Sequence, residues 1–266
     1  MKSKFKLVIS FIALVFLACE ENKKECCAFK KDSTNQPVSS TIPNRQIGYI
    51  IPGLNHGFEQ SPININSSTV TTTGKHKITL YYKDKIKEIE NLGHTVQLDF
   101  DEGSSISVDD TIFNFKQCHF HTPSEHLIDG VTFPMEMHIV NMMPSADSTA
   151  VPQYMVIAVL FKEGRENAFI TDFLNLVPKG EYAKKDLTPG IVKLSDLFGN
   201  VPKEVQRHFY EYRGSLTTPP YTESVRWYVL KHVFEASPEQ IEAINKIEGD
   251  NARHVNGQYG RMVSSN

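Results

Sequence analysis

The stretch Gln117-Cys118-His119-Phe120-His121 alternates polar and apolar side chains, as a β-strand with one buried face does. Side chains at i and i+2 of a strand point to the same face, so His119 and His121 project together with Gln117 beside them. Cys118 and Phe120 point to the other face. A small, buried, apolar role is therefore predicted for Cys118.

A second alternating run follows a short connection and places His138 two residues after Glu136. If the two runs pair, His138 meets His119 and His121, and three imidazoles converge. Three imidazoles with an open fourth position are the donor set of a catalytic Zn²⁺ site. A metal-bound imidazole needs an acceptor on its other ring nitrogen. Gln117 can serve His119 in this way, and Glu136 can reach the third imidazole or a neighbour.

Several other segments alternate in the same way and predict further strands. These segments are Ile78 to Tyr82, Thr95 to Phe100, Thr111 to His121, Met135 to Asn141 and Val225 to Leu230. The nearly continuous apolar run Tyr154 to Phe161 predicts a central strand buried on both faces. The charged run Lys83 to Glu90 alternates in sign and predicts a solvated strand and turn.

Two helices are predicted beside these strands. One covers Asn167 to Val177, and the other begins at Ser237-Pro238-Glu239-Gln240, a capping box with Pro at the first helical position. The fold class is therefore mainly β (α+β): a single domain built on a large twisted, mostly antiparallel sheet with a few short peripheral helices.

Composition fits one sizeable domain and excludes some partners. The chain has 266 residues, of which 40% are hydrophobic and 22% charged. A net charge of −3 gives no reason to expect nucleic acid as a partner. Of the four cysteines, Cys118 alone lies in the folded part, which therefore cannot form an internal disulfide. The chain has no Cys-x-x-Cys spacing, which argues against a thiolate zinc site.

The N-terminus predicts export and a membrane anchor. Residues 1–18 begin with lysines and continue with an apolar run too short to span a bilayer, as in a lipoprotein signal peptide. Cys19 follows as the predicted lipidated residue, so the protein is expected in the periplasm or on the outer membrane or cell surface. Residues 19–44 are polar and predict a flexible tether, in which the role of Cys26 and Cys27 stays open. Residues 45–266 are the predicted folded domain.

The segment Gly214 to Pro220 ends in two prolines and predicts a rigid loop, because consecutive prolines cannot lie inside a central ladder. The loop presents the hydroxyl groups of Thr217 and Thr218 beside the apolar Leu216. From these residues alone, an ordinary structural turn is an equally good interpretation.

Several of these motifs together resemble the α-class carbonic anhydrase family, over roughly residues 58 to 263. The resemblance is carried by Gln60-Ser61-Pro62-Ile63-Asn64-Ile65, Gln117 to His121, Ser124-Glu125-His126, Glu136 to His138, Gly214 to Pro220 and Glu223 to Trp227. It implies a zinc enzyme that hydrates CO₂ reversibly to bicarbonate and a proton by attack of zinc-bound hydroxide. The implied zinc ligands are His119, His121 and His138.

The resemblance also implies roles for residues around the metal. Thr217 accepts a hydrogen bond from the hydroxide and donates one to Glu125, and His94 carries the released proton to solvent. An apolar pocket for CO₂ is implied, formed by Val140, Val156, Leu216, Thr218 and Trp227.

The sequence departs from the family in two places. The family's N-terminal aromatic cluster is not evident, so no role is assigned to Tyr49. Tyr221 stands where many secreted bacterial relatives have a cysteine bonded to an N-terminal cysteine, so packing has to replace that disulfide. Two alternative functions stay open: a catalytically silent surface binding module, and a zinc esterase.

Overall fold

The computed structural model describes residues 57–72, 76–81, 83, 86–199 and 201–266. The predicted signal peptide 1–18, the tether 19–44 and the start of the 45–266 domain lie outside these residues, as do Cys19, Cys26, Cys27 and Tyr49. Within the described part of the chain, no helix is long and apolar enough to cross a membrane.

The described chain forms strands and a few short helices. The strands are β1 Asn64–Ile65, β2 Thr71–Thr72, β3 Ile78–Tyr81, β4 Ile86–Asn91, β5 Val96–Phe100, β6 Ser105–Val108, β7 Thr111–His121, β8 Leu127–Ile128, β9 Val131–Thr132, β10 Met135–Met142, β11 Tyr154–Glu163, β12 Ala183–Asp186, β13 Phe209–Gly214, β14 Val225–Leu230, β15 Phe234–Ala236 and β16 Ser264–Ser265. The helices are α2 Ala168–Leu174, α3 Ser195–Phe198 and α4 Pro238–Glu248, with 3-10 turns η2 Ser67–Thr69 and η3 Val205–Arg207.

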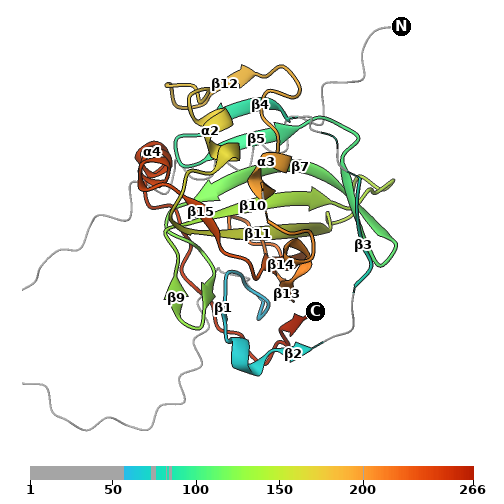
Figure 1. Cartoon of the computed structure of the whole chain (residues 1–266). Helices are drawn as coiled ribbons and strands as arrows, with labels where there is room; N and C mark the ends of the chain where they lie inside the picture. Colours follow the sequence, from blue (N-terminus) through green and yellow to red (C-terminus); the bar gives the residue numbers. More distant parts are fainter. Residues whose placement is uncertain (1–56, 73–75, 82, 84–85, 200) are drawn as a thin grey trace, which may run out of the picture. The chain divides into compact units, whose positions relative to one another are not determined.

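One twisted sheet of thirteen strands dominates the fold (Figure 1). Its main path runs β12-β4-β5-β7-β10-β11-β14-β13-β16-β2, and β1, β8 and β9 form a separate small sheet. Most neighbours are antiparallel, whereas β11 pairs with β14 and β15 in parallel. The predicted fold class is therefore confirmed. The predicted strands coincide with β3, β5, β7, β10, β11 and β14, with small differences at their ends.

The two faces of the sheet bury separate apolar clusters. The larger one lies under the helices, where Phe120 of β7 packs against Phe173 of α2 with ring centroids 5.3 Å apart. Cys118 belongs to it as a buried free thiol, as strand parity predicted. The smaller cluster lies on the opposite face and contains Val140 and Trp227. His138 and Val140 share a strand parity, so the imidazoles lie on this second face.

Local signals explain where the longer helices begin. Ser237 caps α4 by accepting from the backbone N–H of Gln240, whose side chain returns the bond, which is the predicted capping box. Asn167 caps α2 through its side-chain oxygen. The short helix α3 was not predicted, because its four residues are too few to show a helical period.

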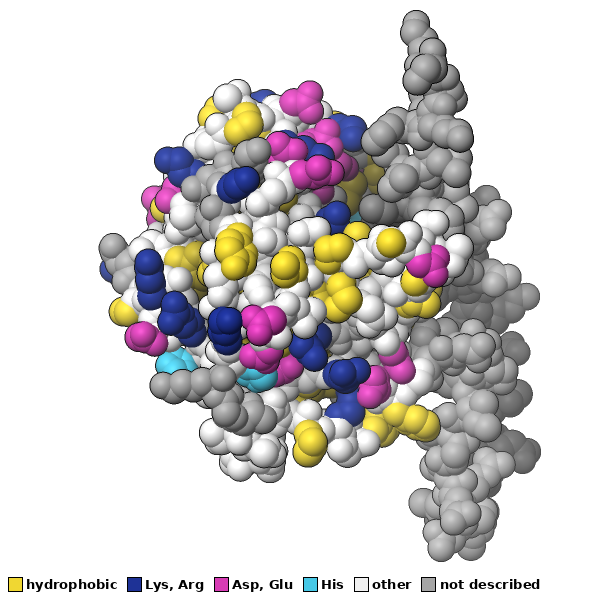
Figure 2. Space-filling view, turned by 90° about the vertical axis from the view of Figure 1, so that its right-hand side faces the viewer, with side chains coloured by type: hydrophobic (Ala, Val, Ile, Leu, Met, Phe, Trp, Pro, Cys, Tyr) yellow, Lys and Arg dark blue, Asp and Glu magenta, His cyan; other side chains and the backbone are white. Residues whose placement is uncertain are grey.

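The interpretation of Lys83 to Glu90 as a solvated strand and turn was wrong in part. Ile86–Asn91 is β4, an inner strand between β12 and β5, and Ile86 and Ile89 are fully buried. Lys87 is exposed and Glu88 and Glu90 are half-buried, and these charged residues hid the apolar face. Elsewhere on the surface, positive and negative side chains are interspersed (Figure 2).

Candidate metal centre

Antiparallel pairing of β7 with β10 brings three imidazoles together. His119 lies directly opposite His138, and His121 lies opposite Glu136. The ring centroids of His121 and His138 are 4.6 Å apart, and those of His119 lie 5.0 Å and 5.3 Å from the other two rings. One nitrogen from each ring lies within 4.8 Å of the others, which is the spacing needed to share one ion.

Hydrogen bonds orient two of the three rings. The Nδ1 atom of His119 is 2.8 Å from Gln117 Oε1, which leaves Nε2 for an ion. The Nε2 atom of His138 is 2.7 Å from Glu136 Oε1, which leaves Nδ1. Both ring nitrogens of His121 are buried and have no partner of strict hydrogen-bond geometry within the described chain, although Asn251 lies close and Glu125 Oε1 is 3.7 Å from Nδ1. Buried polar atoms without a partner are costly, so this ring in particular is suited to an ion.

Burial also determines the charge of these rings. It lowers the pKa of His119 well below its ordinary range and lowers the pKa of His121 to about 4. Burial lowers the pKa of His138 as well, even though Glu136 acts in the opposite direction. All three imidazoles are therefore neutral at neutral pH, and neutral imidazole is the form that binds a metal.

A chain of buried hydrogen bonds continues behind the triad. Glu136 Oε1 is 2.6 Å from His126 Nδ1, and His126 Nε2 is 2.6 Å from the hydroxyl oxygen of Tyr212. The Tyr212 hydroxyl in turn donates to Ser61 Oγ at 3.0 Å. Sequence reasoning assigned no role to His126 or Tyr212. The burial of His126 between Glu136 and a tyrosine depends on contacts between distant strands, which no local spacing reports.

Glu125 lies beside the imidazoles and is almost completely buried. Its Oε1 accepts the backbone N–H of Arg253 at 2.9 Å, and its Oε2 is 3.8 Å from His138 Nε2. Burial raises the pKa of Glu125 to about 7, while His138, the Arg253 N–H and the Thr217 hydroxyl oppose that shift. Oε2 has no partner of strict hydrogen-bond geometry in the described chain, so Thr217 contacts Glu125 loosely here.

The apolar side chains predicted to form a pocket belong to one cluster. Val140, Val156 and Trp227 are buried in it, and Leu216 packs against it. The Trp227 ring lies 4.8 Å from the His138 ring and donates its Nε1–H to Ser215 O. Thr218, by contrast, is exposed. The structure thus brings four of the five predicted pocket residues together beside the triad and leaves Thr218 at the solvent edge.

His94 lies in the exposed turn between β4 and β5. Its Nδ1 is 2.9 Å from Leu92 O, and its carbonyl accepts from Asn251 Nδ2 at 2.7 Å. Asn251 Nδ2 also donates to Phe120 O, next to two of the triad residues. This single amide therefore ties the His94 turn to strand β7.

Tyr221 ties together segments that a disulfide joins in some relatives. The Arg253 guanidinium lies 3.9 Å from the centroid of the Tyr221 ring and donates to Ser61 O and Gln60 Oε1. Stacking and charge-assisted hydrogen bonds thus connect the loop after the two prolines with the start of the domain. Cys118 is the sole cysteine in the part that the structure describes, and its thiol is free.

A buried acid near this centre predicts a pH-dependent stability. Glu248 of α4 accepts from the Thr122 hydroxyl at 3.1 Å, and burial raises its pKa from 4.5 to about 8. Between these values the unfolded chain loses a proton that the folded chain keeps, so stability falls as pH rises. Glu248→Gln, which resembles the protonated acid, should therefore gain melting temperature over the unsubstituted protein between about pH 5 and about pH 8.

Thermal unfolding at several pH values measures this difference. Glu242→Gln serves as the control, because Glu242 is exposed on the same helix and is paired with Lys246 at 2.7 Å. A melting-temperature difference for Glu248→Gln that stays constant over this pH range would contradict the prediction.

A mostly antiparallel sheet that presents three neutral, converging imidazoles on two neighbouring strands defines a protein with a three-histidine metal site. The family model of eukaryotic-type carbonic anhydrases matches residues 51–265. The chain is 38% identical to a carbonic anhydrase of Neisseria gonorrhoeae over 213 residues, which are 78% of this chain and 77% of the relative. It is 34% identical to alpha carbonic anhydrase 4 of Arabidopsis thaliana, over 79% of this chain and 75% of the relative.

A solved structure agrees with these relatives. The α-carbonic anhydrase of Thermovibrio ammonificans, in complex with the inhibitor sulfanilamide, superposes with a TM-score of 0.70 at 35% identity, covering 78% of this chain and 87% of that one. The chain belongs to the carbonic anhydrase family.

Proposed function

We propose that this protein is a zinc-dependent carbonic anhydrase that hydrates CO₂ reversibly to bicarbonate and a proton. The observation that carries the proposal is the convergence of His119, His121 and His138 with one nitrogen of each ring within 4.8 Å of the others. Bound Zn²⁺ supplies a hydroxide nucleophile near neutral pH, because it lowers the pKa of its water to about 7 in known carbonic anhydrases.

A second set of possible metal ligands beside the triad is not a competing zinc site. His126, Glu136 and His138 also offer close ligand atoms, but they are separated by hydrogen-bond distances of 2.6 Å and 2.7 Å. Glu136 therefore fixes the tautomers of two imidazoles, which is how outer residues support metal ligands.

Thr217 and Glu125 are proposed to orient the nucleophile. A buried Glu125 carboxylate accepts the Thr217 hydroxyl hydrogen, which leaves the Thr217 oxygen to accept a hydrogen bond. That oxygen then fixes the direction in which the nucleophile's lone pair points. The backbone N–H of Arg253 holds the other oxygen of Glu125 in place at 2.9 Å.

The apolar wall beside the triad is proposed to receive CO₂. Val140, Val156, Leu216 and Trp227 offer no charge, and CO₂ carries neither charge nor dipole. The same wall makes no hydrogen bond to bicarbonate, so the charged product leaves readily. Thr218 lies exposed at the edge of this wall, and we assign it to the route between the wall and solvent.

Metal analysis and stopped-flow CO₂ hydration on the full chain test the proposal. We expect one zinc ion per chain and hydration activity that disappears when a chelator removes the metal and returns with added zinc. Stoichiometric zinc without hydration activity would refute the enzyme and favour a silent binding module. Ester hydrolysis without CO₂ hydration would favour the zinc esterase.

His94 is proposed to carry protons from the active site to solvent, because its imidazole stands in an exposed turn tied to β7 through Asn251. In weak buffer, His94→Ala should lower kcat by about 10–100-fold while kcat/KM stays unchanged. A small imidazole buffer should restore the lost turnover. If kcat is unchanged, or if imidazole restores nothing, His94 is not the proton carrier.

We further propose that the protein is exported and anchored by lipid on Cys19, in the periplasm or on the outer membrane or cell surface. The lysine-rich start, the short apolar run and the cysteine that follows support this proposal. Cys19→Ser should move the protein from the membrane fraction to the soluble fraction of the cells. Unchanged membrane association would rule out this anchor.

A further inference from the structure

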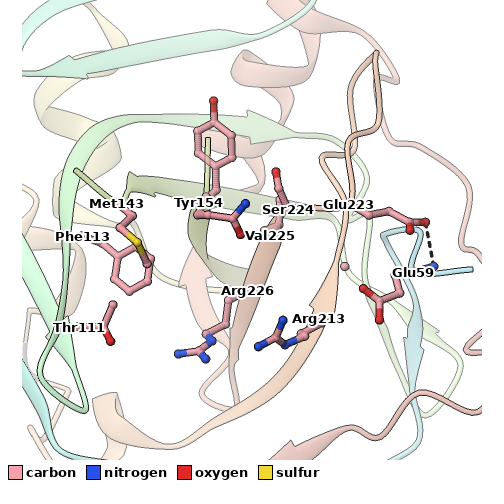
Figure 3. A pocket seen from close by; sticks show the side chains of 12 residues that line it. Glu59, Thr111, Phe113, Met143, Tyr154, Arg213, Glu223, Ser224, Val225 and Arg226 are labelled. Atoms are coloured by element: carbon pink, nitrogen blue, oxygen red, sulfur yellow. Dashed lines mark hydrogen bonds between the residues drawn. The ribbon is translucent and has the colours of Figure 1, made fainter. Parts of the chain in front are cut away.

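A cavity of about 180 Å³ lies away from the imidazoles, where β7, β10, β11, β13 and β14 meet (Figure 3). Its lining combines two arginines, two glutamates, several neutral polar side chains and an apolar wall. Among the lining residues are Arg213, Arg226, Ser224, Glu223, Phe113 and Met143. Its volume is below the range of about 300–1,000 Å³ typical of sites for drug-sized ligands, so it suits a small molecule.

Two arginines face each other across neighbouring strands in this cavity. Arg213 of β13 is the direct partner of Arg226 of β14 in an antiparallel ladder, so both side chains leave the same face. Figure 3 shows the two guanidinium groups side by side along one border of the cavity. Like charges directly opposite each other destabilise a strand pair, so this pair calls for an anion between or beside them.

The protein itself neutralises this pair incompletely. The Nε atom of Arg226 is 3.5 Å from Glu211 Oε1, and the same oxygen accepts the Tyr228 hydroxyl at 3.1 Å. Arg213 forms no ion pair with any residue that the structure describes. The Glu211 carboxylate thus pairs with one of the two guanidinium groups on this strand pair, and the other, on Arg213, is exposed.

A buried hydroxyl group with no partner lies at the end of the cavity away from the arginines (Figure 3). Ser224 is 8% exposed, and its Oγ has no hydrogen-bond partner within the described residues. Its backbone is held on both sides: the N–H donates to Thr222 O at 3.0 Å, and the carbonyl accepts from Tyr154 N at 2.9 Å. The hydroxyl points away from the guanidinium groups of Arg213 and Arg226, so it is not a donor to an ion held between them (Figure 3).

The opposite border of the cavity limits the charge that it accepts. Glu223 Oε1 there accepts the Glu59 backbone N–H at 2.8 Å and the Gln60 amide at 2.9 Å, which keeps this carboxylate in place (Figure 3). Two nearby carboxylates disfavour an anion with several charges. On the remaining side, Phe113 and Met143 form an apolar wall.

We propose that this cavity binds a small, planar, singly charged oxyanion of the carboxylate type between Arg213 and Arg226. The guanidinium fork matches the two oxygens of such a group. Two sources share this chemistry: a small organic carboxylate, and bicarbonate. The site is separate from the triad, because Arg226 and Trp227 are neighbours in one strand and point to opposite faces.

NMR of the zinc-loaded full chain tests this site directly. The Nε–Hε signals of Arg213 and Arg226, assigned by loss in Arg213→Gln and Arg226→Gln, are followed while sodium acetate replaces sodium chloride at constant ionic strength. A second titration uses bicarbonate and a third uses inorganic phosphate. We expect saturable shifts of both signals with acetate or bicarbonate, and weaker binding of phosphate.

The variants separate this site from the metal centre. Arg213→Gln should weaken binding by about tenfold or more, whereas Ser224→Ala, which removes a hydroxyl that faces away from the arginines, should leave binding unchanged. Arg207→Gln is the control, since Arg207 is exposed outside the cavity. Saturation by bicarbonate alone would identify the site as one for the product of the proposed reaction, and saturation by acetate as well would identify a carboxylate site.

Three results would overturn the proposal. These are the absence of a saturable shift at either arginine, binding that is unchanged in Arg213→Gln, and tighter binding of phosphate than of either carboxylate-type anion. Zinc content and CO₂ hydration of Ser224→Ala should match the unsubstituted protein. The failure of this site would therefore leave the proposed enzyme activity untouched, and the reverse also holds.

Discussion

Replacing His138 with alanine is expected to abolish both zinc binding and CO₂ hydration. The substitution removes one of three convergent donors, and two imidazoles on one strand cannot enclose the ion alone. It also takes away a hydrogen-bond partner of Glu136. Loss of an outer partner alone costs about 10–100-fold in metal affinity, so loss of the ligand itself should cost more.

Zinc competition with a chromophoric chelator measures this affinity, and stopped-flow hydration measures the activity. His208→Ala is the matched control, because His208 is exposed and distant from the triad in the fold. The control should retain full zinc content and activity. If His138→Ala kept stoichiometric zinc, the ion would have to bind elsewhere, and the three-histidine centre would be wrong.

The sequence predicts those features of the metal centre that follow from the geometry of a single strand. The i, i+2 spacing placed His119 and His121 on one face, excluded Cys118 and matched Gln117 with His119, and each of these placements follows from strand parity. The five alternating segments and the continuous apolar run Tyr154 to Phe161 likewise predicted six strands of the sheet.

What the sequence does not predict depends on pairing between distant segments. His126 differs from any other histidine only because β10 brings Glu136 and β13 brings Tyr212 to its two nitrogens. The opposed arginines of β13 and β14 are separated in sequence by the Gly214 to Pro220 loop, and only the ladder register makes them neighbours. β4 was misjudged because two adjacent charged residues, Lys87 and Glu88, stand between its buried isoleucines and interrupt the period of two that a strand shows.

Glu136 contacts both a zinc ligand predicted from strand parity, His138, and a histidine that only the fold brings near, His126. Replacing Glu136 with glutamine is expected to reduce both stability and zinc affinity. Its carboxylate accepts four hydrogen bonds: from the backbone N–H groups of Glu125 and His126, and from ring nitrogens of His126 and His138. Burial alone would raise its pKa, but the two histidines and their hydrogen bonds lower the pKa of Glu136 well below its usual range.

A carboxylate only accepts hydrogen bonds, whereas the amide of glutamine presents an NH₂ group toward donors that point at it. At least one buried donor then loses its acceptor, at a cost of about 1–3 kcal/mol for each group. We therefore expect Glu136→Gln to lower the free energy of unfolding by about 2–5 kcal/mol in metal-free protein. Zinc affinity should fall by about 10–100-fold, because His138 loses the acceptor that fixes its tautomer.

Urea unfolding of metal-free protein and chelator competition measure the two effects separately. Gln117→Ala provides the comparison, because it also removes the hydrogen-bond acceptor of a zinc ligand, His119. Gln117 is only half-buried, and alanine brings no NH₂ group against a buried donor. That variant should lose zinc affinity with little change in stability. If Glu136→Gln were as stable as the unsubstituted protein, the four donors would have found other acceptors. Glu136 would then contribute to zinc affinity and not to stability.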